Sequence, residues 1–456
     1  MLASDVDKSN GNLPMIAMQN SSHSEHPLQT PIADEKQTSV HEELPQQRGF
    51  VPPNGGFEAW SLVFAGFLVF SNTWGLVSSF GAFQAFYLRD LLSTQSASAI
   101  SWIGSVQAFL VVFVGIFAGP LYDRGYLRSL VFTGCSLTVF GMMMTSLSKS
   151  YYQVLLAQGF CAGLGAGLTY IPTMALISSY FTTKRPIAVG LAAVGSSVGG
   201  VVFPIMFRQL QPQIGFGWSV RCITFINLAF AVCIVLILCK RREGAAGGGS
   251  ARSLLDMTAV REPIFLSWTA GLFFLFLAYY IPLFFIVSYA RWVLGTSENM
   301  AFYMLAILNG GSCVGRTFPY LLGQRVKPIY TLTFSASLGS VLVFSWIGVR
   351  SSAAYIVWCV LWGFVAGVLV TAPTSTMAHP VISPHMGVIG TRMGMSWSVS
   401  ALGSIIGSPI AGALADVPAG NFLHAQIFAG TVMAIGVICL TAPLLAVERY
   451  DRKPKN

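Results

Sequence analysis

Residues 263–289 read PIFLSWTAGLFFLFLAYYIPLFFIVSY, a run that contains no charged side chain. A helix needs about 20 mostly apolar residues to cross the roughly 30 Å of hydrocarbon in a bilayer, where its backbone groups must be hydrogen-bonded internally. This run is long enough and apolar enough to meet both conditions. It therefore predicts a membrane-spanning helix.

Similar stretches fill nearly everything between Phe57 and Val447. Hydrophobic residues make up 54% of the chain and charged residues only 9%, so a water-soluble fold has too little polar surface to hide them. We therefore expect an all-α integral membrane protein with twelve transmembrane helices. The spans are predicted at 57–84, 100–121, 129–147, 152–178, 186–207, 218–239, 263–289, 299–321, 329–348, 353–377, 387–414 and 423–446.

Basic residues are distributed unevenly between the loops, and loops rich in Lys and Arg tend to stay cytoplasmic. One set of loops and the C-terminal tail carry most of them: Arg124, Arg128, Lys184, Arg185, Lys240, Arg241, Arg242, Arg252, Arg261, Arg325, Lys327, Arg449, Arg452, Lys453 and Lys455. The opposite loops carry fewer: Arg89, Lys149, Arg208, Arg221, Arg291 and Arg350. We therefore expect a multi-pass plasma-membrane protein with both ends cytoplasmic. The net charge of +9 then indicates topology and contact with anionic membrane lipids, and no nucleic-acid partner.

Two segments differ in composition from the spans. Residues 1–50 are too polar to bury a core and predict a disordered cytoplasmic tail. Residues 241–262 include a run of glycines and predict a cytoplasmic linker. The chain then divides into an N-terminal six-helix bundle at 51–240, a C-terminal six-helix bundle at 263–447 and a short cytoplasmic tail at 448–456.

A weak internal repeat supports this division. Lys184, Gly195-Ser196 and Gly199 in the fifth span recur at a constant offset in the eleventh span, as Arg392, Gly403-Ser404 and Gly407. Duplicated halves are common in transporters, and Gly-x-x-x-Gly spacing lets helices approach closely. The same spacing also occurs in static membrane proteins.

One loop carries a signature. Gly119-Pro-Leu-Tyr-Asp123-Arg124-Gly-Tyr-Leu-Arg128 lies between the second and third spans. It resembles the loop 2–3 signature of the major facilitator superfamily, Gly-x-x-x-Asp-Arg followed by a further basic residue. The resemblance implies the major facilitator fold, two six-helix halves that work by alternating access.

Further stretches resemble the monocarboxylate-porter family in its fungal form. Asn54-Gly-Gly-Phe57-Glu58-Ala-Trp60 is similar to the motif before its first span, and Tyr180-Phe-Thr-Thr-Lys184-Arg185-Pro-Ile-Ala-Val-Gly190 to the motif leading into its fifth. The sequence stretches at 72–84, 390–395 and 409–412 also resemble those of the fungal members. The resemblance covers every span and omits only the N-terminal tail.

Departures from the family bear on proton coupling. The animal lactate carriers are thought to move a proton through a Lys in the first span and an Asp–Arg pair in the eighth. Ser78 and Ser312 stand at the Lys and Asp positions of this chain, and only Arg316 remains. That relay is therefore not carried over, although Glu58 or Asp123 offers an alternative route for protons.

Two arginines lie well inside predicted spans, Arg316 in the eighth and Arg392 in the eleventh. An intramembrane charge costs about 2.5–3.5 kcal/mol on insertion scales, so such charges usually face a cavity or a partner. Apart from Glu58 at the very start of the first span, no Asp or Glu lies within a predicted span to neutralise them, and a carboxylate-bearing solute would complement their guanidinium forks. Alternatively, they bond helix-end carbonyls or extend to the cytoplasmic surface, or Arg392 pairs with Asp123.

Other residues within the spans are candidates for solute contact. Asn72, Ser79, Gln84 and Asn309 offer hydrogen bonds, and Trp74 and Tyr170, together with Tyr279 and Tyr280, offer aromatic surface. Hydrogen bonds between helices account equally well for the polar residues. Packing or an interfacial belt is the commoner role of aromatic residues in such a chain.

The loop signatures supply the candidate gate. A carboxylate at Asp123 would be stabilised by the dipole at the cytoplasmic N-terminus of the eleventh span, and breaking that contact would let the halves rock. We therefore predict gating roles for Asp123 and Arg124, and for the signature residues Arg128, Lys184 and Arg185. Gating is favoured here over solute binding.

Enzyme, metal and cofactor roles find no support in the motifs. The sequence lacks a Walker loop, a Gly-x-Ser-x-Gly elbow and a His-Glu-x-x-His pair, and its eight cysteines lack metal-ligand spacing. We therefore expect no catalytic residues and no cofactor.

The sequence favours a secondary-active transporter of a small organic solute that carries a carboxylate, exporting a secondary metabolite. Proton-coupled uptake of a monocarboxylate or similar nutrient is the alternative. A non-transporting solute sensor, a different class of protein, would typically carry a longer cytoplasmic signalling segment.

Overall fold

The computed structural model describes residues 53–240, 255–322, 325–385 and 388–452. Over these ranges the secondary structure is helical, apart from an isolated bridge between Asp416 and Asn421. The predicted tail 1–50 and the first part of the predicted linker lie outside the described residues.

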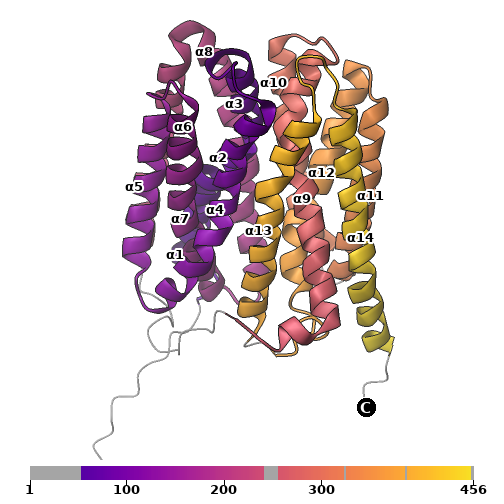
Figure 1. Cartoon of the computed structure of the whole chain (residues 1–456). Helices are drawn as coiled ribbons and strands as arrows, with labels where there is room; N and C mark the ends of the chain where they lie inside the picture. The colour runs from indigo at the N-terminus through magenta and orange to yellow at the C-terminus, as the bar shows by residue number, and fades with distance from the viewer. Residues whose placement is uncertain (1–52, 241–254, 323–324, 386–387, 453–456) are drawn as a thin grey trace, which may run out of the picture. The chain divides into compact units, whose positions relative to one another are not determined.

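The helices run in chain order (Figure 1). Before the linker lie α1 Gly56–Phe70, η1 Ser71–Gly75, α2 Leu76–Ser78, α3 Phe80–Phe86, η2 Tyr87–Leu91, α4 Ala97–Asp123, α5 Leu127–Thr145, α6 Tyr151–Val154, η3 Leu155–Ala162, α7 Gly163–Tyr180 and α8 Arg185–Leu238. After it lie η4 Ala259–Arg261, α9 Pro263–Trp292, α10 Glu298–Leu322, α11 Pro328–Ser345, η5 Trp346–Gly348, α12 Ser352–Thr376, α13 Ile389–Leu414 and α14 Leu423–Arg452.

Ten helical segments among the described residues are long and apolar enough to cross a membrane. One of them, α8, has 54 residues, about 80 Å at 1.5 Å per residue and more than twice the hydrocarbon thickness. Gly215 interrupts it with φ 76° and ψ 171°, so the chain reverses there and forms two rods. With these two rods and the 25-residue α10, the described residues contain the twelve rods expected from the sequence.

Some boundaries differ from the prediction. The first rod continues through η2 to Leu91 instead of ending near residue 84. The first residues of the predicted tail at 448–456 are helical, because α14 continues to Arg452, and the start of that tail at 448 stays a prediction. The α14 helix extends because Lys327 bonds Asp451 at 2.7 Å and Tyr330 bonds Glu448 at 3.0 Å, which tie its last turns to α11.

Two groups of helices lie side by side in Figure 1, Gly56–Leu238 in indigo to magenta and Pro263–Arg452 in orange to yellow. We call them the first and second sets. The ends that carry the linker and Arg452 define the linker side, at the bottom of the figure, and the ends near Gly215 and Glu298 define the far side. Residues Gly49–Asn456 cluster as one compact unit, so the division into two bundles stays a prediction.

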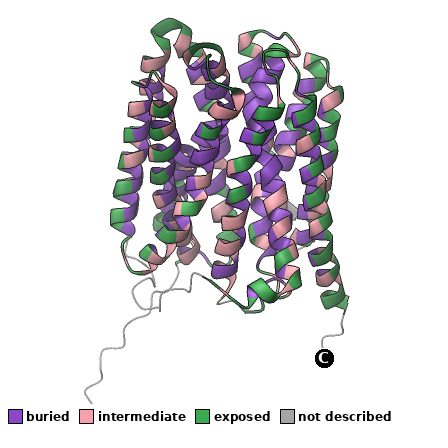
Figure 2. Cartoon of the chain, in the orientation of Figure 1, coloured by how far each residue is buried: buried purple, intermediate pink, exposed green. Residues whose placement is uncertain are grey.

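Burial follows the pattern of a membrane protein (Figure 2). Large apolar side chains such as Phe132 and Phe334 are 63% and 70% exposed, and they lie on helices that are long and apolar enough to cross a membrane. Polar residues such as Ser79, Gln84 and Asn227 are instead fully buried. Lipid contact explains both observations, because hydrocarbon solvates the apolar faces and leaves polar groups to find partners inside.

The repeated glycines bring equivalent helices together. A Cβ atom added at Gly195 would lie 2.0 Å from the carbonyl oxygen of Phe67 in α1, and one added at Gly407 would lie 1.9 Å from that of Leu277 in α9. Both distances are too short for any residue other than glycine. The repeat seen in the sequence therefore corresponds to the same close approach in each set, α8 on α1 and α13 on α9.

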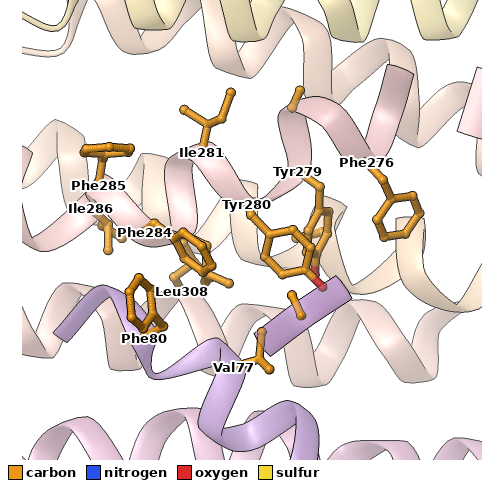
Figure 3. Close-up of a cluster of buried hydrophobic side chains, with 14 of the residues drawn as sticks. Val77, Phe80, Phe276, Tyr279, Tyr280, Ile281, Phe284, Phe285, Ile286 and Leu308 are labelled. Carbon is orange, nitrogen blue, oxygen red and sulfur yellow. The ribbon is translucent and has the colours of Figure 1, made fainter. Parts of the chain in front are cut away.

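The buried apolar core is continuous between the sets toward the far side. It includes Phe80 of the first set and Phe284 of the second, whose rings lie 4.8 Å apart, as Figure 3 shows. A separate cluster, with Leu62, Tyr122 and Ile234, fills the linker-side part of the first set. The two sets therefore share a core on the far side, while the first set has its own core on the linker side.

Candidate functional site

Arg316 of α10 is a buried charge whose side chain is 5% exposed. Its Nε donates to Ser312 Oγ, one turn earlier in the same helix, at 3.3 Å. Among the described residues no acidic side chain makes an ion pair with it. A neutral hydroxyl compensates a buried guanidinium only partly, so this cation keeps the capacity to bind an anion.

Aromatic residues from three other helical segments lie within electrostatic range of Arg316 or pack against a residue that does. Arg316 acts electrostatically on the hydroxyl groups of Tyr170 in α7 and of Tyr279 and Tyr280 in α9. Trp74 of η1 packs edge-on against Tyr170 at 5.7 Å, and both of these rings are partly exposed. We call Arg316, Trp74, Tyr170, Tyr279 and Tyr280 the Arg316 cluster. It joins residues of both sets.

The aromatic contacts continue along α9. Phe276 lies 5.0 Å from Trp397 of α13 and 5.3 Å from Tyr279, and Tyr279 lies 4.8 Å from Tyr280. Figure 3 shows Tyr279 and Tyr280 beside Val77 of the first rod. The ring faces of Tyr279 and Tyr280 offer apolar surface within electrostatic range of Arg316.

The first rod departs from regular α-helix beside this cluster. Ser71–Gly75, which contains Asn72 and Trp74, is π-helical. A π-helical turn inserts extra backbone and redirects side chains, and such turns are frequent at functional sites. Sequence reasoning had singled out Asn72 and Trp74 by residue type but offered no signal for this irregular turn.

The polar candidates are mostly engaged in helix packing. Asn309 Nδ2 donates to the carbonyl oxygen of Gly200 in α8 at 3.1 Å, and Asn72 Nδ2 donates to that of Asn227 at 3.0 Å. Ser79 Oγ donates to the carbonyl oxygen of Gly75 at 2.7 Å, and Gln84 Oε1 accepts from Ser101 at 3.4 Å. The bonds of Asn309, Asn72 and Gln84 join different helices and match the helix-to-helix alternative, whereas the Ser79 bond stays within the first rod. Solute contact by these four residues stays a prediction.

Arg392 has acidic partners that the sequence did not indicate. Its Nη1 and Nη2 donate to the two carboxylate oxygens of Glu262 at 2.6 Å each, and its Nε donates to Asp256 at 2.8 Å. Nη1 also donates to the carbonyl oxygen of Ile382 at 2.7 Å. We call this group the linker clasp.

The expectation that Arg392 lacks a carboxylate partner was therefore wrong. The linker folds back on α13, and the search for acidic residues within the spans did not include it. The α13 helix begins at Ile389, which places Arg392 in its first turn. Arg392 is 2% exposed, and all three of its guanidinium nitrogens donate to protein acceptors. Both observations favour a structural role over solute binding.

The clasp is expected to stay charged at physiological pH. The Thr258 hydroxyl and then the Arg392 guanidinium bond the Asp256 carboxylate and lower its pKa to about 2. Because this folded-state pKa lies below the unfolded value of roughly 3.9, its contribution to stability is complete above about pH 4 and is lost as the pH falls toward 2. The destabilisation caused by Asp256→Asn should therefore be constant from pH 5 to pH 8.

Replacing Glu262 with Gln should destabilise the protein by about 2 kcal/mol, less than the roughly 3–5 kcal/mol of a fully buried pair, because the Glu262 side chain is 35% exposed. The thermal midpoint in detergent measures this effect. Glu448→Gln is the matched control, because the amide oxygen of Gln still accepts from the Tyr330 hydroxyl and the variant removes only the ion pair with the 82% exposed Arg452 at 3.7 Å, a surface pair of a kind that contributes little. Equal midpoints for the two variants would contradict the clasp.

The predicted gate residues lie at the linker-side ends of α4, α7 and α8. Asp123 ends α4, followed by the exposed Arg124 and Arg128. Lys184 and Arg185 are also exposed, and Arg185 Nε donates to the carbonyl oxygen of Phe181 at 3.1 Å. Their roles in gating stay predictions.

The two stretches of the first set that resemble monocarboxylate-porter motifs contact each other. Asn54 Nδ2 donates to Thr183 Oγ1 at 2.7 Å, and its Oδ1 accepts from the backbone N–H of Thr182 at 3.0 Å. An amide both donates and accepts, which a carboxylate cannot do when ionised. Asn54 therefore satisfies both of these partners, whereas an ionised Asp would lack the donor for Thr183.

Contacts between the sets are found toward the far side in the described part of the chain. Ser98 Oγ donates to the carbonyl oxygen of Pro409 at 2.8 Å, and Arg208 bonds Glu298 at 2.7 Å. Sequence reasoning missed this region because Arg208 and Glu298 were ordinary loop-end charges. The far side is therefore closed in this structure.

Similarity to known proteins covers most of the chain. Residues 62–402 match the Major Facilitator Superfamily. The MFS-type transporter dbaD of Emericella nidulans is 38% identical over 85% of this chain and 86% of its own length. The aspyridones efflux protein apdF of the same fungus is 35% identical over 84% of this chain and 77% of its own. The agnestins efflux protein AgnL12 of Paecilomyces divaricatus is 32% identical over 88% and 91%.

A solved structure shares the fold. A bacterial homologue of the human lysosomal transporter Spinster, in an inward-facing and unoccupied conformation, superposes with a TM-score of 0.63 over 88% of this chain and all of its own. The sequence identity is 14%, so this likeness concerns the fold alone.

Proposed function

Because this chain belongs to the Major Facilitator Superfamily, and is thus a membrane transporter, we propose that it exports a small organic anion across the plasma membrane. The exported solute is a secondary metabolite that carries a carboxylate or an equally acidic group. The finer assignment to the fungal monocarboxylate porters is part of this proposal.

The observation that carries the proposal is the buried Arg316 without an acidic partner in the described residues. A guanidinium held at 5% exposure in a protein interior attracts an anion strongly, because the low dielectric weakens screening. The aromatic rings beside it supply contact area for a solute larger than lactate. Two relatives are described as efflux proteins for named metabolites, which supports export as the direction.

The mechanism we propose is alternating access with the linker side cytoplasmic. The shared core and ion pairs on the far side correspond to a state closed to the outside. An anion entering from the linker side would reach Arg316, which lies six residues, about 9 Å, from the end of α10. Separation of the two sets on the far side would then release it.

Proton-coupled uptake is less well supported. Arg316 bonds the neutral hydroxyl of Ser312. Ser312 stands at the position where the lactate carriers have an acidic residue. Coupling to protons would need a carboxylate elsewhere, and Glu58 and Asp123 are the residues on the linker side to test first.

Deletion of the gene in the source organism tests the proposal. Untargeted metabolite profiles of cells and medium should show an acidic organic compound that accumulates inside and falls outside when the gene is removed. Reintroducing the gene should restore the external level. If the deletion instead stops consumption of an external organic acid, the transporter works in uptake and the proposed direction is wrong.

A further inference from the structure

Three arginines form ion pairs with the carboxylate of Glu298, the first residue of α10, on the far side. Arg208 of α8 bonds one carboxylate oxygen at 2.7 Å. Arg89 of η2 forms an ion pair with the other oxygen, and Arg291 of α9 lies 3.9 Å from it. Arg89 and Arg208 belong to the first set, whereas Arg291 and Glu298 belong to the second. One carboxylate therefore joins both sets.

Neighbouring polar contacts reinforce this joint. Arg208 Nε donates to Asn299 Oδ1 at 2.9 Å, and Gln209 Nε2 donates to Tyr303 Oη at 3.2 Å. Both bonds run from α8 to α10. A cavity of about 260 Å³ lies beside them and is lined in part by Phe86, Ser288 and the four charged residues.

The balance of charge makes Glu298 the critical member. The charges of Arg89 and Arg291 both act on Arg208, so the three guanidinium groups repel one another. Asp90 neutralises part of the Arg89 charge at 2.6 Å. Asp90 belongs to the same rod as Arg89, however, and among the described residues it makes no ion pair with the second set. Without the Glu298 carboxylate, like charges would face each other across the joint and favour its opening.

Other far-side contacts between the sets carry no charge, among them the Ser98–Pro409 hydrogen bond and the Phe80–Phe284 ring pair. Gly412 packs against Ala97 and Ser98, and Gly81 packs against Leu283. These are close apolar and backbone contacts, which separate without leaving a charge unpaired. The ion pairs are partly shielded from water, since the side chains of Arg208 and Glu298 are 17% and 25% exposed. Their rupture is therefore expected to dominate the barrier to far-side opening.

We propose that Glu298 is the latch of the far-side gate, holding the two sets together through Arg89 and Arg208 until the transporter opens on that side. This inference rests on alternating access but not on the identity of the solute or the direction of transport. A conformational measurement can therefore reject the role of Glu298 as a latch and leave the proposed export function unaffected.

The test measures accessibility of a cysteine at Ser288, which lines the cavity and is 2% exposed. The Ser288→Cys chain is treated with a membrane-impermeant maleimide applied from each side of the membrane. Mass spectrometry of the peptide containing residue 288 gives its labelling rate, so the native cysteines can stay in place. The same measurement is repeated with Glu298→Gln or Asp90→Asn added.

Glu298→Gln should raise the far-side labelling rate roughly tenfold, the effect of about 1.4 kcal/mol on an opening equilibrium. Asp90→Asn removes a carboxylate from the same surface without breaking the joint and should leave the rate within about twofold. Equal rates for the two variants would overturn the latch. Arg208→Gln breaks the same ion pair from the first set and should also raise the rate, so the test stands if Glu298→Gln fails to fold.

A second reading separates gate opening from local loosening. A cysteine replacing Tyr170, which is partly exposed in this state, should be labelled more slowly from the linker side when Glu298→Gln is present. Alternating access requires this opposite change, because opening one side closes the other. Faster labelling at both positions would mean that the variant only loosens the packing, and the latch would be rejected.

Discussion

Replacing Arg316 with Gln should abolish export of the organic anion while the protein stays in the membrane at its normal level. Gln fills most of the side-chain volume and keeps a donor for Ser312, but it removes the positive charge that balances the solute. A hydrogen bond to a charged group contributes about 1.5–3 kcal/mol, and a bidentate fork has two. The initial rate of efflux from preloaded cells should therefore fall at least roughly 100-fold.

Two further variants sharpen that expectation. Arg316→Lys keeps the charge but loses the planar fork, so it should retain a small part of the transport rate. Arg221→Gln is the matched control: Arg221 is also a partly buried arginine in a helix, bonded to Ser146 at 3.2 Å and stacked on Trp218 at 4.7 Å. It lies outside the Arg316 cluster and should leave transport unchanged. Normal efflux by Arg316→Gln would remove this residue from the mechanism.

Replacing Gly407 with Ala should lower the stability of the protein by about 1–3 kcal/mol, the usual effect of overpacking. The added Cβ would lie 1.9 Å from the carbonyl oxygen of Leu277, and this neighbour is backbone, which cannot rotate away. The α13 and α9 helices would have to separate. The thermal midpoint of the detergent-solubilised protein, followed by size-exclusion chromatography after heating, measures the loss.

The same helix provides the control for this substitution. A Cβ atom added at Gly394 would meet no neighbouring atom within 4 Å, so Gly394→Ala adds a methyl group in open space. Alanine favours a helix by roughly 1 kcal/mol over glycine, so this variant should be at least as stable as the natural chain. Gly195→Ala, at the repeat-related contact with Phe67, should behave like Gly407→Ala. Equal midpoints for Gly407→Ala and Gly394→Ala would argue against the close approach.

The Arg316 cluster could be predicted in part. A charge inside an apolar run is visible in the sequence, and so is the missing acidic partner at Ser312. Trp74 and Tyr170 were candidates by residue type alone. Their placement beside Arg316 depends on how α7, η1, α9 and α10 pack, and the π-helical turn at Ser71–Gly75 had no sequence signal.

The two arginines, which look alike in the sequence, differ in their partners in the structure. Both looked like unpaired intramembrane charges. Arg316 has no acidic partner in the described residues, whereas Arg392 binds Asp256 and Glu262 of the linker. Those partners lie more than a hundred residues away in the chain, and nothing local to α13 indicates that the linker folds back on it.

The sequence by itself determined the twelve apolar rods, the membrane environment and the glycine positions at which helices approach closely. These depend on the length and polarity of local segments, because the bilayer imposes one thickness and one hydrogen-bonding rule on every span. Tertiary structure alone decided which charges are paired, at the linker clasp and at Glu298, and which rings lie near Arg316. Such contacts join distant segments, so they depend on the packing of helices and not on any local pattern.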